Sequence, residues 1–77
     1  MTVEQDCLAV LAKELGPAAK TFLIRQSRRH LNKEPSTLQK SDIDELAKWC
    51  QIEIQLAIGA QIADNVKKGL LALKQQS

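Results

Sequence analysis

The fold is decided at LAKELGPAAK, residues 11–20, where one helix is expected to end and the next to begin. Gly16 can take the left-handed backbone conformation that commonly closes a helix. Pro17 carries the fixed φ that suits the first position of a following helix. The run therefore predicts two helices joined by a tight corner.

Helical signals extend from this corner in both directions. Upstream, Thr2 and Gln5 form a capping-box pattern that predicts a helix over residues 3–15. Its apolar residues recur at helical spacing, at Cys7, Leu8, Leu11 and Leu15. Downstream, a second helix is expected over residues 17–31, with an apolar side made of Ala19, Phe22 and Leu23 and with Ile24 and Leu31 on one flank of it. Residues 32–37 are expected to form a turn, because Pro35 disfavours helix at the residue before it.

A third helix is predicted over residues 41–74. Ser41 is a favourable N-cap, and the acids Asp42, Asp44 and Glu45 lie in the first turn, where they complement the helix dipole. One segment conflicts with this prediction, because residues 52–58 alternate like a half-buried strand. We expect helix there as well, since no second alternating run exists to pair with it.

The length of this third helix bears on assembly. At about 1.5 Å per residue it would extend for about 50 Å, whereas a compact chain of this size has a radius of gyration of roughly 11–12 Å. The helix must therefore either bend near Gly59 or project and pack on a partner. We expect an all-α fold of three helices in a single domain, residues 1–77, that forms a dimeric helical bundle. The expected self-association interface consists of Ile43, Leu46, Trp49, Cys50, Ile54, Ile58, Ile62, Val66 and Leu70.

Composition argues against most kinds of site chemistry. The net charge is only +2, His30 is the single histidine, and Cys7 and Cys50 lack a Cys-x-x-Cys spacing. We expect both cysteines to be buried apolar residues rather than a disulfide, with no metal site, no cofactor and no catalytic residue. The acidic group at residues 42–45 has an ordinary explanation in the helix dipole. The chain is therefore expected not to be an enzyme.

The ends of the chain bear on its location. Residues 1–6 are acidic and lack the basic start and apolar run of a secretory signal. No stretch reaches the ~18 apolar residues that a membrane span needs. We therefore expect a cytoplasmic protein without membrane contact, and Met1 favours a free-standing polypeptide over a fragment of a larger one.

The second predicted helix is basic. Arg25, Arg28 and Arg29 lie on one arc away from its apolar side, with Lys33 following, and could meet phosphates or an acidic partner. A solvated face with cations near the helix C-terminus explains the same pattern. The Ala-x-x-x-Gly spacing before the corner also resembles helix-turn-helix proteins, although a proline after the turn and Arg25 at a usually buried position depart from that motif. A DNA-binding regulator that uses this helix is the alternative function.

The pattern L-A-x-x-L-G-P-x-A-K at residues 11–20 resembles a small helical domain at the C-terminal ends of bacterial signalling proteins, among them serine/threonine kinases and nucleotide cyclases. Leu23 and Arg25 continue the pattern, and the resemblance covers about the first third of the chain. It implies an accessory regulatory or oligomerising role and assigns no functional residue. We therefore expect a bacterial protein–protein interaction module in signalling or regulation, which forms a homodimer and binds another signalling protein.

Overall fold

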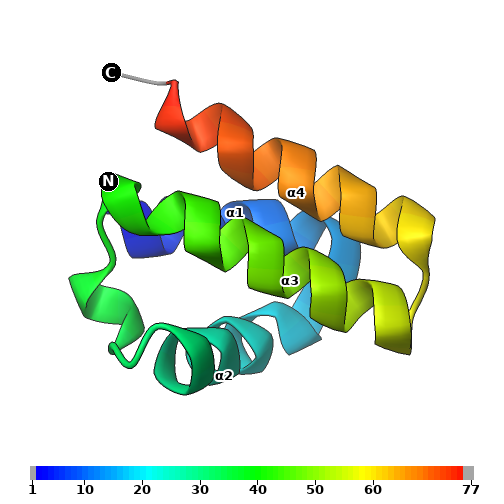
Figure 1. The fold of residues 1–77 in the computed structure, drawn as a ribbon, viewed down its shortest axis with the longest axis horizontal. Coiled ribbons are helices and arrows are strands. Elements are labelled where there is room, and N and C mark those ends of the chain that lie inside the picture. The colour runs from blue at the N-terminus through cyan, green and yellow to red at the C-terminus, as the bar shows by residue number, and fades with distance from the viewer. Residues whose placement is uncertain (1, 76–77) are drawn as a thin grey trace.

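Four α-helices make up most of residues 2–75, the part of the chain that the computed structural model describes (Figure 1). They are α1 (Val3–Leu15), α2 (Ala19–His30), α3 (Ile43–Ala57) and α4 (Ala60–Lys74). Short 3-10 turns occupy Gly16–Ala18, Pro35–Thr37 and Lys40–Asp42. Residues 2–75 contain no strand, and the predicted all-α class is confirmed.

The corner between α1 and α2 forms where the sequence predicts it. Both bonds of the capping box are present: the Gln5 backbone N–H donates to the Thr2 hydroxyl at 3.1 Å, and the Thr2 N–H donates to the Gln5 side chain at 3.3 Å. Gly16 ends α1 with a φ of +61°, which favours glycine. Because Pro17 lies in a 3-10 turn, α2 begins at Ala19 rather than at the proline.

The predicted third helix is divided into two helices at Gly59. Of the two alternatives, a bend near Gly59 or a projecting straight helix, the structure has the first. The backbone N–H groups of Ile58 and Gly59 both donate to the Ile54 carbonyl, at 2.8 and 3.0 Å, and close α3. Gly59 then takes a φ of +151°, a conformation open to glycine, and the chain reverses. Residues 52–57 are helical despite their alternation. α4 runs back beside α3 as an antiparallel hairpin, within a molecule whose longest extent is 29 Å (Figure 1).

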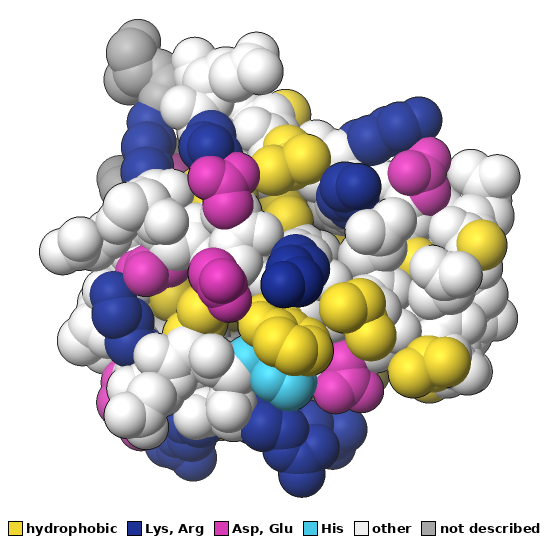
Figure 2. All heavy atoms as spheres, viewed as in Figure 1, with side chains coloured by type: hydrophobic (Ala, Val, Ile, Leu, Met, Phe, Trp, Pro, Cys, Tyr) yellow, Lys and Arg dark blue, Asp and Glu magenta, His cyan; other side chains and the backbone are white. Residues whose placement is uncertain are grey.

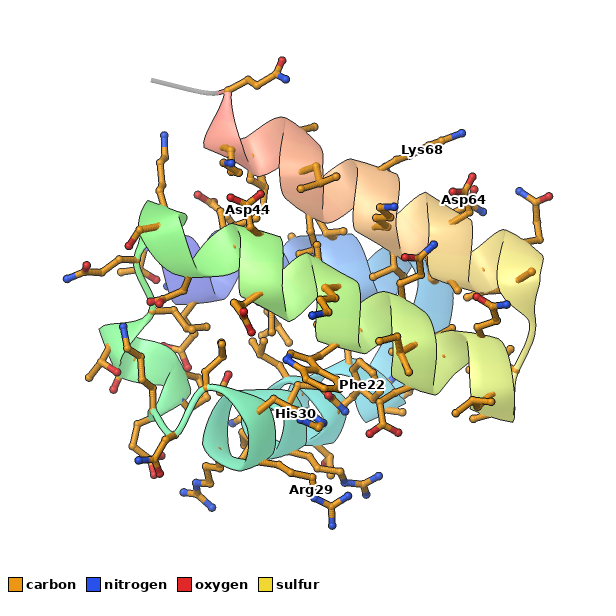
Figure 3. All side chains as sticks on the ribbon, in the orientation of Figure 1. Phe22, Arg29, His30, Asp44, Asp64 and Lys68 are labelled. Atoms are coloured by element: carbon orange, nitrogen blue, oxygen red, sulfur yellow. The ribbon has the colours of Figure 1, made fainter. Side chains whose placement is uncertain are left out.

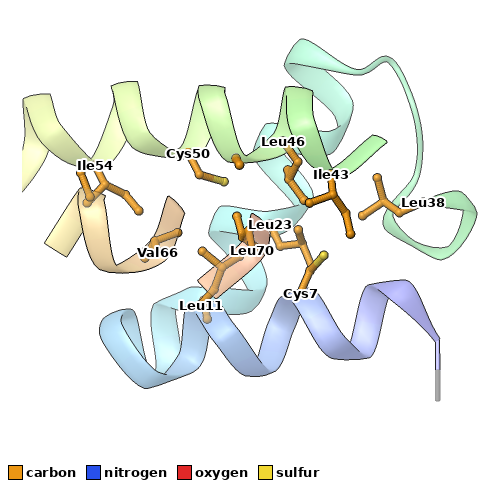
Figure 4. Close-up of a cluster of buried hydrophobic side chains, with 13 residues drawn as sticks. Cys7, Leu11, Leu23, Leu38, Ile43, Leu46, Cys50, Ile54, Val66 and Leu70 are labelled. Atoms are coloured by element: carbon orange, nitrogen blue, oxygen red, sulfur yellow. The ribbon is translucent and has the colours of Figure 1, made fainter. Parts of the chain in front are cut away.

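The hydrophobic core lies between this hairpin and α1, with α2 and the loop around Leu38 closing it (Figure 4). Its buried members are Cys7, Leu11, Ala19, Leu23, Leu38, Ile43, Leu46, Ala47, Cys50, Ile54, Ala63, Val66 and Leu70. Six of the nine residues expected at a self-association interface belong to this core, namely Ile43, Leu46, Cys50, Ile54, Val66 and Leu70. This corrects the prediction for those six. Because α4 folds back, their side chains are covered by their own chain and offer nothing to a second copy.

The side of α2 that packs on the core contains both apolar and polar residues. Its buried residues are Ala19, Leu23, Gln26 and Ser27. The side-chain polar atoms of Gln26 and Ser27 have no hydrogen-bond partner within the described residues. An unsatisfied buried polar group costs about 1–3 kcal/mol. The packing of α2 on the core therefore depends on its apolar residues and on contacts such as the stacking of His30 on Trp49.

Candidate interaction surfaces

The largest exposed apolar side chains gather at the C-terminal end of α3. Leu56 is 82% exposed, Ile58 is 58% exposed and Ile52 is 40% exposed. We call these three residues the α3 end patch. Ile52 and Leu56 are four residues apart and so share one side of α3, while Ile58 directly follows the helix. Figure 2 shows hydrophobic side chains on the surface along α3 and toward the turn into α4.

The patch arises from the strand-like alternation of residues 52–58. On a helix, apolar residues spaced by two fall on both sides, so only some of them can face the core. Ile54 is buried, whereas Ile52 and Leu56 point outward. Of the nine predicted interface residues only Ile58 belongs to the patch, and Trp49 and Ile62 are half-buried. The alternation was the sequence signal that could have identified the other two members.

Trp49 joins α2 to α3 within the chain. Its ring stacks on the His30 ring, with centroids 4.0 Å apart and planes 5° from parallel. The indole N–H donates to the Glu45 carboxylate at 3.1 Å, and the His30 Nε2 lies 3.4 Å from a Glu53 oxygen. Trp49 therefore serves mainly as an anchor between α2 and α3 of its own chain.

The exposed side of α2 is almost entirely cationic. Its exposed residues are Lys20, Thr21, Arg25, Arg28 and Arg29, and we call them the α2 basic face. Figure 2 shows Lys and Arg side chains gathered along the lower edge of the molecule, below the histidine, and Figure 3 places Arg29 there beside His30. The predicted outward position of the three arginines is confirmed.

Two of the four cations predicted to meet an anionic partner are engaged within the chain. Arg28 forms a bidentate pair with Glu34, at 2.9 and 3.0 Å, and this hydrogen bonding raises the pKa of Arg28 and lowers that of Glu34. Lys33 lies 2.8 Å from a carboxylate oxygen of Asp42. Arg25 and Arg29 form no ion pair with any residue from 2 to 75. These two arginines are therefore the available charges of the predicted set.

The acidic residues at the start of α3 each serve a different local contact. Asp42 accepts hydrogen bonds from the Lys33 ammonium and from the Gln39 backbone N–H. Both lower the pKa of Asp42, and the Lys33 hydrogen bond has the larger effect. Asp44 lies 2.6 Å from the Lys74 ammonium, which ties α3 to the end of α4. These contacts account for the acidic run by folding alone.

Cys7 and Cys50 are free thiols inside the core. Burial raises the pKa of Cys7 to about 11, with the charge of Asp6 adding to the effect. Burial also raises the pKa of Cys50 to about 12. A thiol held in its neutral form is a poor nucleophile and metal ligand. Within residues 2–75, no group of three or more His, Cys, Asp or Glu side chains is arranged to hold a metal ion.

No protein-family model, curated protein or solved structure matches the chain. Among the described residues, no helix combines the length and the apolar character needed to cross a bilayer. Inferences about function therefore rest on the α3 end patch and the α2 basic face.

Proposed function

We propose that this protein is a small helical protein–protein interaction module that self-associates through the α3 end patch, without catalytic activity. The observation that carries the proposal is the exposure of Leu56, 82% of which is open to solvent. Fully burying one such side chain contributes roughly 1.5–3 kcal/mol. Ile52, four residues earlier on the same side of α3, and Ile58, exposed directly after the helix, add further apolar area at this end of α3.

A second copy of the chain fits this patch best. No charged residue occurs between Glu53 and Asp64, so the turn between α3 and α4 can face its own copy without placing like charges together. In a two-fold symmetric dimer both copies use the same surface, so the α3 end patch of one copy would pack against the α3 end patch of the other. Three side chains make a small interface, so we expect a weak dimer with a dissociation constant on the order of 10–100 µM.

The biological setting belongs to the same proposal. The resemblance of residues 11–20 to a domain of bacterial signalling proteins supports a regulatory accessory role, with another signalling protein as a further partner. Two buried free thiols suit a reducing compartment such as the cytoplasm. Self-association would then control how many copies of a partner are brought together.

Sedimentation velocity over a concentration series from about 10 to 500 µM tests the proposal. We expect the wild-type chain to shift from monomer toward dimer across this range and Leu56→Glu to stay monomeric with unchanged helical content. Ala72→Glu is the matched control, because it adds the same charge at an exposed site near the end of α4 and should dimerise like the wild type. A wild-type chain that is monomeric throughout, or a Leu56→Glu variant that dimerises equally well, would refute the proposal.

A further inference from the structure

The α2 basic face differs in chemistry from the α3 end patch. All five of its side chains are hydrogen-bond donors, and four are cations, at Lys20, Arg25, Arg28 and Arg29. Phe22 and Ile24, the nearest apolar side chains of α2, are half-buried. The surface therefore presents positive charge and donors with little accompanying apolar area.

The charges of this face are only partly balanced inside the chain. Glu34 engages Arg28 through both of its oxygens. Lys20, Arg25 and Arg29 form no ion pair with any described residue. Arg25 and Arg29 are four residues apart on one helix, an arrangement in which like charges repel and destabilise the helix. An external anion bound between them would relieve this repulsion.

We propose that the α2 basic face binds the phosphate backbone of duplex nucleic acid, through Lys20, Arg25 and Arg29. Guanidinium groups match phosphate oxygens in bidentate geometry. α2 has 12 residues and is about 18 Å long at ~1.5 Å per residue. At ~100° per residue Lys20 and Arg29 lie on opposite flanks of its exposed side, so the helix can place cations on phosphates at both sides of a duplex groove. This inference does not depend on self-association, because the two surfaces use different residues.

The composition of the face distinguishes duplex nucleic acid from other anionic partners. A protein interface has an apolar centre, and a membrane-surface helix has apolar side chains beside its cations. Both features are weak here, since every apolar residue of α2 is buried or half-buried. Single-strand binding relies on aromatic platforms for base stacking. The one aromatic residue of α2, Phe22, is half-buried, which favours a duplex contacted through its phosphates.

The salt dependence of binding provides a quantitative test. We measure fluorescence anisotropy of a labelled mixed-sequence DNA duplex with the full chain at several salt concentrations. Three cations on phosphates predict a slope of log K against log salt of about −2.7, or about 40-fold weaker binding at 200 mM than at 50 mM salt. Arg25→Gln and Arg29→Gln should each reduce the steepness by about 0.9.

The Arg28–Glu34 pair supplies an internal check. Glu34→Gln should release Arg28, tighten binding and steepen the slope to about −3.6, whereas Arg28→Gln should leave the slope near its original value. Lys68→Gln is the charge control matched to Arg28→Gln, because Lys68 pairs with Asp64 at 3.0 Å as Arg28 does with Glu34. Lys68 lies on the opposite side of the molecule from Arg29 (Figure 3), and its replacement should leave the slope unchanged.

Several results would overturn the inference. These are no duplex binding at low salt, binding that Arg25→Gln and Arg29→Gln leave intact, or a slope that changes equally with Lys68→Gln. Equal or tighter binding to polyglutamate, to single-stranded DNA or to vesicles rich in phosphatidylserine would assign the face to an acidic protein, a single strand or a membrane surface instead.

Discussion

α1 and α4 approach closely at Gly69. Whether Gly69→Ala raises or lowers the free energy of unfolding depends on one neighbouring side chain, that of Val10. A Cβ atom added to Gly69 would lie 2.7 Å from Cγ1 of Val10, well inside the 3.5–4.0 Å of an ordinary carbon contact. Val10 cannot easily move away, because a β-branched side chain has one strongly preferred rotamer in a helix. The Gly69→Ala variant therefore tests whether the two helices meet as the structure shows.

Two opposing effects set the magnitude. Replacing glycine by alanine inside a helix stabilises it by about 1 kcal/mol. Forcing an extra methyl group into a packed contact costs about 1–3 kcal/mol. We expect the contact to dominate, so that Gly69→Ala lowers the free energy of unfolding by about 1 kcal/mol and the melting temperature by about 4–8 °C. When Val10→Ala removes both γ carbons, the same Gly69→Ala change should stabilise by roughly 0.5–1 kcal/mol.

Chemical denaturation of the four proteins of this double-mutant cycle, followed by far-UV circular dichroism, gives the coupling directly. We expect a coupling free energy of about 1.5–2 kcal/mol between the two positions, within the range measured for residues in contact. If Gly69→Ala stabilises the wild-type and Val10→Ala backgrounds by the same amount, the glycine only weakens its helix and α1 does not pack against it.

Three further predictions follow from the turn, the thiols and an ion pair. Gly59→Ala should lower the free energy of unfolding by about 1–3 kcal/mol, since its φ of +151° strains any other residue; unchanged denaturation would place the chain reversal elsewhere. Because burial raises the pKa of Cys7 to about 11 and of Cys50 to about 12, a thiol reagent near neutral pH should modify both only as the chain unfolds in urea; rapid labelling of the native protein would contradict their burial. Lys33 lowers the pKa of Asp42 in the folded state, so this pair should stabilise the protein above about pH 4 and lose its contribution as the pH falls through the lowered pKa. Lys33→Gln should therefore reduce the loss of unfolding free energy on acidification, measured by denaturation at several pH values. An unchanged acid dependence would contradict the pair.

Local features of the chain were predictable because they depend on residues close together in sequence. The Thr2–Gln5 capping box joins groups three residues apart, and it formed as expected. The end of α1 at Gly16 follows from the backbone freedom of glycine. The outward position of Arg25 and Arg29 follows from helical periodicity against an apolar side.

The candidate surfaces were only partly predictable, because they depend on contacts between residues of different elements. The pairing of Arg28 with Glu34 spans the end of α2 and removes one cation from the basic face, a contact that no periodicity encodes. Ile54 and Leu56 are both apolar and two residues apart, yet the first is buried and the second is exposed. Which side of α3 faces the core depends on where α1 and α4 pack against it.

Sequence alone determined that this protein is helical, where its first corner lies, and that the apolar stretch after residue 41 exceeds what one straight helix could cover. Only the tertiary structure decided that Gly59 reverses the chain, so that α4 covers α3 and most of the expected dimer interface becomes core. The physical reason is that glycine permits both a bend and a continuous helix. The choice between them is made by burial of apolar side chains from distant parts of the chain, which leaves Ile52, Leu56 and Ile58 at the surface.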